Sequence, residues 1–148
     1  MSSFFTALSY SVPQSNPTCL GVTGTYNVIG NSMLPSTSLN TCDALKSANG
    51  DYIYTMQSDG NSVVYFTKYG QNGVAFWETG TAGKGPGPWT MRYQPDGNFA
   101  LYNSKNEPQW SAKIEKSTAR NVTMKDDGNL VAYGTENENS PVWASRKV

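Results

Sequence analysis

Three stretches of the chain repeat one short pattern: QSDGNSVVY (residues 57–65), QPDGNFALY (residues 94–102) and KDDGNLVAY (residues 125–133). Each stretch surrounds an Asp-Gly-Asn with alternating polar and apolar positions, which is typical of two strands joined by a tight turn. In the first stretch every second position holds, in order, an amide, a carboxylate, an amide, a small apolar side chain and a phenol. Such a row of hydrogen-bond donors and acceptors with one apolar spot suits a sugar better than it suits catalysis.

The turn determines which side chains share a face of each hairpin. With a three-residue loop over residues 58–60, Gln57 lies opposite Asn61, so the alternating polar positions all face the same side. Such a loop is a type I turn closed by a residue in the left-handed region, which glycine adopts at little cost. The opposite faces then carry good core residues: Met56, Val64, Tyr93, Phe99, Leu101, Met124 and Leu130. Ser62 is the exception, because the sister repeats have a large apolar residue there.

A tryptophan follows each repeat, at Trp77, Trp110 and Trp143. A repeat of this length indicates a small sheet that cannot bury its own face, so three such sheets should share one core. We predict that one tryptophan from each repeat fills that core. Trp89 follows the Gly- and Pro-rich residues 80–88, and it could serve as core, as loop anchor or as part of an extended site.

Composition excludes several classes of function. The 148 residues favour one domain, and eleven basic against eleven acidic residues make nucleic acid or an anionic membrane an unexpected partner. No segment is apolar enough to be inserted in a membrane. The chain has no histidine and only two cysteines, which removes the usual general base and metal ligands. We therefore expect no cofactor, no metal and no enzymatic activity.

The N-terminal fifth of the chain is less informative. Residues 1–30 contain no repeat and are expected to be an extension that packs on the first sheet or pairs with it, with a disordered arm as the alternative. Cys19 and Cys42 are either two buried thiols or one disulfide worth roughly 3 kcal/mol. The N-terminus does not resemble a signal peptide, so the expected location is the cytoplasm, or the exterior after export without a conventional signal.

The repeats resemble the signature Gln-x-Asp-x-Asn-x-Val-x-Tyr of the bulb-type, monocot mannose-binding lectins. The resemblance covers residues 31–148 and includes the endings around Trp110 and Trp143. It implies an all-β fold, the β-prism II, in which three four-stranded antiparallel sheets surround a pseudo-threefold axis with one possible sugar site per sheet. We accordingly expect a lectin domain at residues 31–148 behind the extension.

The resemblance also assigns roles to residues. In the first repeat Asp59 and Asn61 would bind the axial 2-hydroxyl of mannose, Gln57 the 3-hydroxyl and Tyr65 the 4-hydroxyl, while Val63 would pack on the sugar edge. The predicted second site consists of Gln94, Asp96, Asn98, Ala100 and Tyr102, and the predicted third of Lys125, Asp127, Asn129, Val131 and Tyr133.

The three sites differ in completeness. Only the first matches the signature at every position. Ala100 removes about 1 kcal/mol of apolar contact from the second site. In the third site Lys125 donates but cannot accept, and it can pair with Asp127 and disable it. The sequence therefore ranks the first site as the strongest and the third as the weakest.

The resulting hypothesis is a non-catalytic lectin that binds α-linked mannose, as the free sugar or in glycans, and serves as an agglutinin or in defence. The family resemblance implies a homodimer formed by exchange of the C-terminal strand, residues 141–148. The alternative is a prism-fold protein, for instance an inhibitor, that has lost sugar binding and acts through protein contacts.

Overall fold

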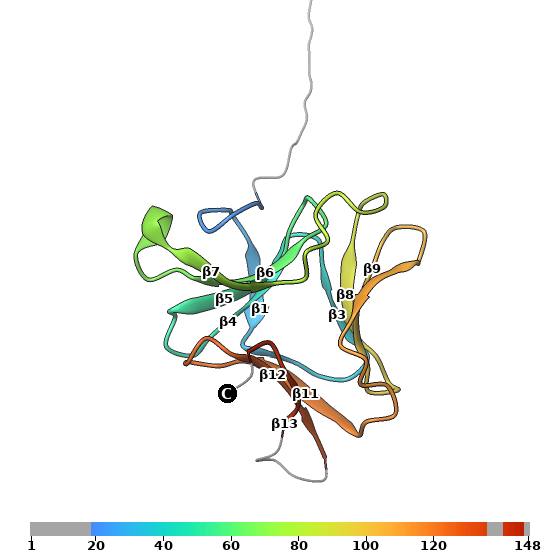
Figure 1. The fold of residues 1–148 in the computed structure, drawn as a ribbon. Coiled ribbons are helices and arrows are strands. Elements are labelled where there is room, and N and C mark those ends of the chain that lie inside the picture. The colour runs from blue at the N-terminus through green and yellow to red at the C-terminus, as the bar shows by residue number, and fades with distance from the viewer. Residues whose placement is uncertain (1–18, 136–140, 147–148) are drawn as a thin grey trace, which may run out of the picture.

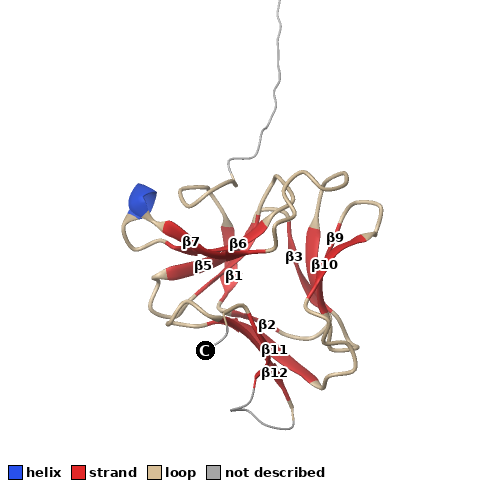
Figure 2. Ribbon diagram, in the orientation of Figure 1, coloured by secondary structure: helices blue, strands red, loops and turns tan. Residues whose placement is uncertain are grey.

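The computed structural model describes residues 19–135 and 141–146, and these residues form three β-sheets arranged as the sides of a triangular prism (Figure 1). Apart from one 3-10 turn, Gly70–Asn72, the regular structure of these described residues is entirely strand (Figure 2). The strands are β1 (Asn27–Gly30), β2 (Ser32–Met33), β3 (Thr37–Asn40), β4 (Asp43–Lys46), β5 (Tyr52–Met56), β6 (Ser62–Phe66), β7 (Val74–Glu78), β8 (Thr90–Tyr93), β9 (Phe99–Tyr102), β10 (Pro108–Ser111), β11 (Ala119–Met124), β12 (Leu130–Gly134) and β13 (Pro141–Ala144). The expected all-β, β-prism II architecture is confirmed.

Each repeat supplies three consecutive antiparallel strands to one sheet, in the orders β5-β6-β7, β8-β9-β10 and β11-β12-β13. The short segment before the repeats adds one further strand to every sheet, because β2 pairs with β11, β3 with β8 and β4 with β5. Residues 32–46 therefore connect all three sheets before the first repeat begins.

The first sheet departs from the expectation of four antiparallel strands. It has a fifth strand, β1, which pairs in parallel with β4. The described part of the expected extension thus lies on the first sheet, while residues 1–18 are outside the described residues. Whether residues 1–30 are a unit separate from residues 31–148 stays a prediction.

The predicted turn occurs in all three hairpins. The backbone N–H at the position before each three-residue loop donates to the carbonyl of the residue after it, at 2.9 Å (Gln57 to Asn61), 2.8 Å (Gln94 to Asn98) and 3.0 Å (Lys125 to Asn129). The glycines that close these loops have φ between 88° and 93°, which is the left-handed region that glycine adopts without strain. The turn also sets the predicted alternation, so the residues expected in the core are buried.

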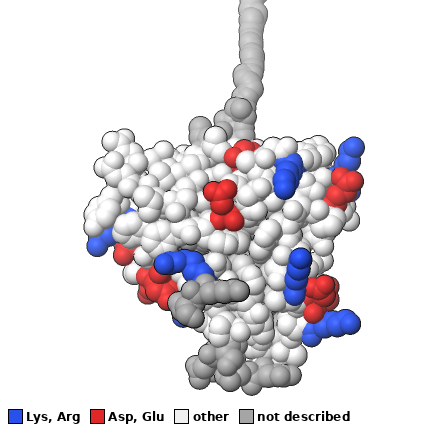
Figure 3. Space-filling model, viewed as in Figure 1, with Lys and Arg blue, Asp and Glu red and all other residues white. Residues whose placement is uncertain are grey.

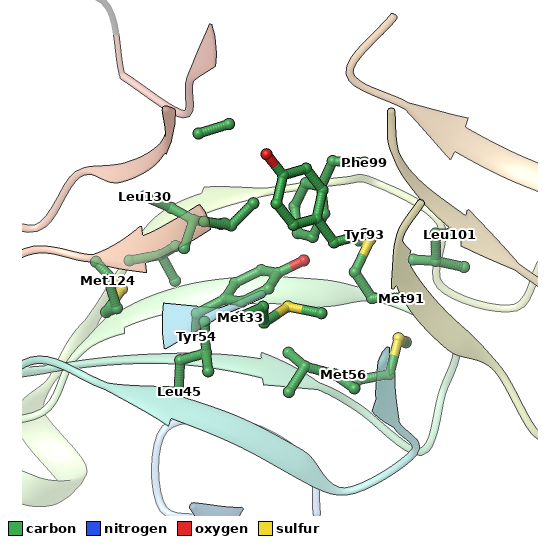
Figure 4. Packing of buried hydrophobic residues seen from close by; sticks show 14 residues of the cluster. Met33, Leu45, Tyr54, Met56, Met91, Tyr93, Phe99, Leu101, Met124 and Leu130 are labelled. Carbon is green, nitrogen blue, oxygen red and sulfur yellow. The ribbon is translucent and has the colours of Figure 1, made fainter. Parts of the chain in front are cut away.

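The core lies where the three sheets face one another (Figure 4). At one end of it Trp77, Trp110 and Trp143 form a ring of edge-to-face contacts, with centroids 5.4, 5.5 and 5.6 Å apart. This arrangement is favoured by the aromatic quadrupoles. The prediction that the three tryptophans fill a shared core is confirmed.

Trp89 anchors the loop that precedes the second repeat. Its backbone N–H donates to the Thr41 hydroxyl at 3.0 Å, and its indole N–H donates to the Lys84 carbonyl at 2.8 Å. The ring lies so close to Gly60 that a Cβ atom there would approach it to 2.7 Å. Of the three roles left open by the sequence, the structure shows the loop anchor, with the ring also packed against the core.

The odd residue Ser62 is explained by its neighbour Tyr54. The two lie diagonally on the core face, because Tyr54 pairs with Val64 and Ser62 with Met56. The positions equivalent to Tyr54 are Met91 and Val122 in the other repeats, so the larger tyrosine faces the smaller serine. The Ser62 hydroxyl donates to the Thr55 carbonyl at 2.7 Å, and both Tyr54 and Ser62 are fully buried. In the first repeat the large side chain is therefore at position 54 and the small one at position 62, whereas the other repeats carry their large apolar residue at the position of Ser62.

We predict strong coupling between these two positions. Ser62→Leu alone should overpack the core and cost about 1–3 kcal/mol, and Tyr54→Val alone should leave a cavity costing about 3 kcal/mol. The double variant copies the third repeat and should lose markedly less stability than the sum of the single variants. Urea unfolding of the four proteins measures this, and additive losses would show that the two side chains do not share volume.

Candidate functional site

The three hairpins share one local frame at their tips. In each, a carboxylate oxygen of the aspartate accepts from the backbone N–H of the asparagine two residues later, at 2.9 Å for Asp59, 2.9 Å for Asp96 and 3.0 Å for Asp127. Asx turns of this kind are a common use of aspartate in loops. The frame fixes the carboxylate beside the asparagine in every repeat.

The asparagine side chains tie each hairpin tip to the segment that follows the tryptophan. Asn61 Oδ1 accepts from the Gly80 and Thr81 backbone N–H groups at 3.0 and 3.2 Å. Asn98 Oδ1 accepts from Ile114 N–H at 3.1 Å, and Asn129 Oδ1 from Arg146 N–H at 2.9 Å. Because the side-chain oxygen is engaged in all three repeats, only the Nδ2 amide group is left to bind a ligand.

A hydroxyl supports this contact in every repeat. The hydroxyls of Thr79, Ser111 and Ser145 each donate to the asparagine oxygen of their own repeat, at 3.1, 3.2 and 3.1 Å. Sequence reasoning missed these residues. The signal that would have found them is a Ser or Thr one or two positions after each tryptophan.

The first repeat brings its five predicted residues together but uses their polar atoms internally. Gln57 Oε1 accepts from the Tyr65 hydroxyl at 2.5 Å, and Gln57 Nε2 donates to Asp59 at 3.1 Å. Asn61 Nδ2 donates to Glu78 at 3.2 Å. Gln57 is only 3% exposed and its amide is engaged at both ends, so this site is closed in the structure.

The cover over the first repeat is the segment of residues 19–26. The Gly21 backbone N–H donates to Gln57 Oε1 at 3.1 Å. The Tyr26 hydroxyl donates to the Gly21 carbonyl at 2.8 Å and lies 3.4 Å from the same Gln57 oxygen. These groups occupy the hydrogen-bonding positions that a sugar hydroxyl would need at Gln57.

A disulfide holds the cover in place. Cys19 and Cys42 are bonded to each other, which decides between the two alternatives that the sequence left open. The Cys19 carbonyl also accepts from the Ser58 backbone N–H at 3.0 Å, directly at the turn of the first hairpin. The covering segment is thus fixed at the disulfide, at the hairpin turn and, through β1, at the edge of the sheet.

In the second repeat some of the predicted polar groups already form hydrogen bonds within the protein. Gln94 Nε2 donates to the Tyr102 hydroxyl at 3.0 Å, and Asn98 Nδ2 donates to the Ser111 hydroxyl at 2.9 Å. Asp96 is exposed, but Ala100 is only 1% exposed. A ligand here would have to compete with these internal hydrogen bonds.

The third repeat forms an open hollow of about 510 Å³. All five of its predicted residues line the hollow, together with Trp143, Val142 and Arg146 from the end of the chain. Within the described residues, the Lys125 ammonium, the Asn129 Nδ2 group and the Tyr133 hydroxyl have no hydrogen-bond partner, and no ion pair joins Lys125 to Asp127. The site that the sequence ranked last therefore has the most groups free for a ligand.

Charges on the surface are mixed in sign on the face shown in Figure 3. In the part of the chain that the structure describes, no three His, Cys, Asp or Glu side chains are placed to hold a metal ion together. The same residues contain no helix long and apolar enough to cross a membrane.

The pKa values of Tyr26, which belongs to the cover, and of Tyr65 beneath it give a test of the cover. Burial raises the pKa of Tyr26, with added repulsion from Tyr65 and Asp59, and burial next to Asp59 and Glu78 raises the pKa of Tyr65. A phenol whose folded pKa exceeds its unfolded value of about 10 contributes stability that is complete below pH 10 and is lost as pH rises through the folded pKa.

We therefore predict a pH-dependent difference between the wild type and Tyr26→Phe. Near pH 7 the variant should be about 1 kcal/mol less stable, because the hydrogen bond to Gly21 is lost. Above pH 10 the difference should shrink, since only the wild type then loses the stability that the neutral Tyr26 phenol provides. Denaturant unfolding at several pH values measures it, and a constant difference would contradict a buried Tyr26.

The comparisons with known proteins bear on the fold and the family. No family model matches the chain. A putative lectin of Acanthamoeba polyphaga mimivirus is 32% identical over 66 residues, covering 45% of this chain and 32% of that protein. A G-type lectin S-receptor-like serine/threonine-protein kinase of Arabidopsis thaliana is 41% identical over 54 residues, covering 34% of this chain and 6% of that protein. The chain thus spans a third or less of these curated relatives.

Solved structures match over most of their length. A monomeric monocot mannose-binding lectin from Gastrodia elata is 30% identical with a TM-score of 0.64, covering 78% of this chain and 96% of that one. The mannose-specific agglutinin of snowdrop, Galanthus nivalis, complexed with methyl-α-D-mannoside, is 27% identical with a TM-score of 0.63, covering 74% and 94%. A Marasmius oreades lectin shares the fold at 22% identity, with a TM-score of 0.68 over 81% and 94% of the two chains.

With three signature hairpins on a β-prism II frame, and with 30% identity over nearly the whole Gastrodia lectin, the chain belongs to the bulb-type, monocot mannose-binding lectin family of non-catalytic, carbohydrate-binding proteins.

Proposed function

We propose that this lectin binds α-linked mannose, and that the third repeat is its main site. The observation that carries the proposal is the open hollow lined by Asp127, Asn129 and Tyr133, where neither the Asn129 amide group nor the Tyr133 hydroxyl has a hydrogen-bond partner among the described residues. The Gastrodia lectin is mannose-binding and the snowdrop lectin is mannose-specific, and both support the choice of sugar.

The geometry supplies the hydrogen bonds that the signature requires. Asp127 accepts and Asn129 Nδ2 donates toward the axial 2-hydroxyl, while the Tyr133 hydroxyl serves the 4-hydroxyl. An epimer that lacks the axial hydroxyl leaves the Asn129 and Asp127 groups without their partner, which is the physical basis of selection. Val131 and Trp143 provide the apolar part of the same hollow.

Binding of one sugar in such an open site is weak, so useful avidity needs several sites. The second repeat lies on a different sheet from the third, and its five residues give the chain a second, weaker contact. This supports a role as an agglutinin or in defence against surfaces rich in mannose. A dimer formed by exchange of the C-terminal strand stays a prediction, since β13 pairs with β12 of its own chain in this structure.

The disulfide supports a site of action outside reducing compartments. Disulfides persist in oxidising environments and are rare in the cytosol. Of the two locations expected from the sequence, we propose the exterior.

The alternative function is binding to protein partners without sugar recognition. The closed first repeat favours it, because the polar groups of the one complete signature already form hydrogen bonds within the protein. A glycan array without binding to any mannose-containing glycan would favour this alternative over the lectin.

Removing single phenol hydroxyls tests which repeat binds. We predict that Tyr133→Phe weakens binding of methyl α-mannoside about tenfold, because one ligand hydrogen bond is lost. Tyr65→Phe is the matched control, and it should leave the affinity within about twofold, since that hydroxyl already donates to Gln57. Isothermal titration calorimetry measures both. The reverse pattern would place binding at the first repeat.

Releasing the cover should add a site. We predict that reduction of the Cys19–Cys42 disulfide lets residues 19–26 leave the first repeat, so that one more methyl α-mannoside binds per chain. Native mass spectrometry counts the bound sugars with and without a dithiol reductant. A Cys19→Ser, Cys42→Ser variant is the control, because its count should not respond to the reductant. An unchanged count in the reduced wild type would show that the cover holds without the disulfide.

A further inference from the structure

The third repeat differs from the other two in the charge at its first position. Gln57 and Gln94 are replaced there by Lys125, whose ammonium carries a charge and can only donate. Lys125 is half-buried and lines two adjoining hollows, the site itself and a neighbouring hollow of about 360 Å³. No carboxylate among the described residues pairs with it. The ammonium thus faces the space that a ligand would enter.

A second cationic residue, Arg146, also lines this hollow. Arg146 follows β13, and its backbone N–H donates to Asn129 Oδ1 at 2.9 Å. Its guanidinium lies 4.6 Å from the centre of the Phe76 ring, a favourable cation–π distance that keeps the side chain in place.

The balance of charge distinguishes this hollow from the first repeat. Its described lining carries two cations, Lys125 and Arg146, against the single carboxylate of Asp127. In the first repeat the asparagine and the phenol instead lie beside Asp59 and Glu78, and both carboxylates help to raise the pKa of Tyr65. A negatively charged group is therefore favoured in the third hollow and disfavoured in the first.

We propose that the third site selects mannose that carries a negatively charged group, a sulfate or phosphate ester, at its 3-position. This inference rests on the proposed function and on the role that the family resemblance gives to the first signature position, which is contact with the 3-hydroxyl. The Lys125 ammonium pairs with the ester oxygens, and Asp127, Asn129 and Tyr133 bind the remaining hydroxyls. A hydrogen bond between charged partners is roughly twice as strong as a neutral one, so the anionic group more than replaces the contact that glutamine makes with a neutral hydroxyl.

The preference must be sensitive to salt and to position. Lys125 is half-buried rather than enclosed, so added salt screens its attraction for the ester. An ester at the 6-position would not lie at the first signature position, and methyl 6-O-sulfo-α-mannoside therefore serves as a regioisomer control. Sulfate and phosphate share the chemistry that Lys125 recognises, and separate titrations show which of the two is preferred.

The experiment is calorimetric titration of the wild type with methyl α-mannoside, its 3-O-sulfate, its 3-phosphate and its 6-O-sulfate. We expect one or both 3-esters to bind about tenfold more tightly than the neutral sugar at low salt, with a smaller advantage at high salt and none for the 6-O-sulfate.

Two substitutions test the assignment to Lys125. Lys125→Gln restores the family signature, and it should remove the preference for the 3-esters while strengthening binding of the neutral sugar. Gln94→Lys places the same charge in the second repeat and should create a preference for 3-esters there. Lys68→Gln, on an exposed loop away from the hollow, is the matched control for net charge and should leave the wild-type preference intact.

The outcomes separate this inference from the function on which it rests. Tighter binding of the neutral sugar than of both 3-esters, or an ester preference that survives Lys125→Gln, would overturn charge selection while mannose binding stands. Failure of the wild type and of Lys125→Gln to bind any of the four mannosides would overturn the proposed function as well.

Discussion

The structure depends on one repeated hydrogen bond, in which a backbone N–H three or four residues after each tryptophan donates to the side-chain oxygen of the signature asparagine. This contact joins the tip of each hairpin to the segment that directly follows the strand carrying the tryptophan, so it links the surface site to the strands that form the ring of Trp77, Trp110 and Trp143. The signature asparagine is thus a structural residue first, and whether it binds a sugar depends on what its remaining amide group meets.

The three repeats differ in what the amide group of the signature asparagine contacts. Asn61 and Asn98 direct their amide groups at Glu78 and Ser111, whereas the amide group of Asn129 is free among the described residues. A sequence signature records which donors and acceptors are present, but it does not record whether they are already paired. The most complete signature is therefore closed, and the least complete one is open.

The hairpins, their three-residue loops, the core faces and the tryptophan ring were all predictable from sequence, because they follow from local alternation and from one glycine per turn. The five residues predicted for the third site line one hollow, and whether any of the three groups binds a sugar stays a prediction. The cover over Gln57 was not predictable, since residues 19–26 have no repeat pattern and their position depends on the distant Cys42 and on the parallel pairing of β1 with β4. The role of Ser62 was equally hidden, because it depends on the size of Tyr54 across the strand pair.

The most direct measurement is an NMR titration of the isotope-labelled, disulfide-bonded protein with methyl α-mannoside. The side-chain amide of Asn129 and the backbone amide of Arg146 should shift as the sugar binds, while the side-chain amides of Gln57 and Asn61 should stay in place. Shifts at Gln57 and Asn61 with none at Asn129 would contradict the account, because binding would then follow the completeness of the signature and not the availability of its donors.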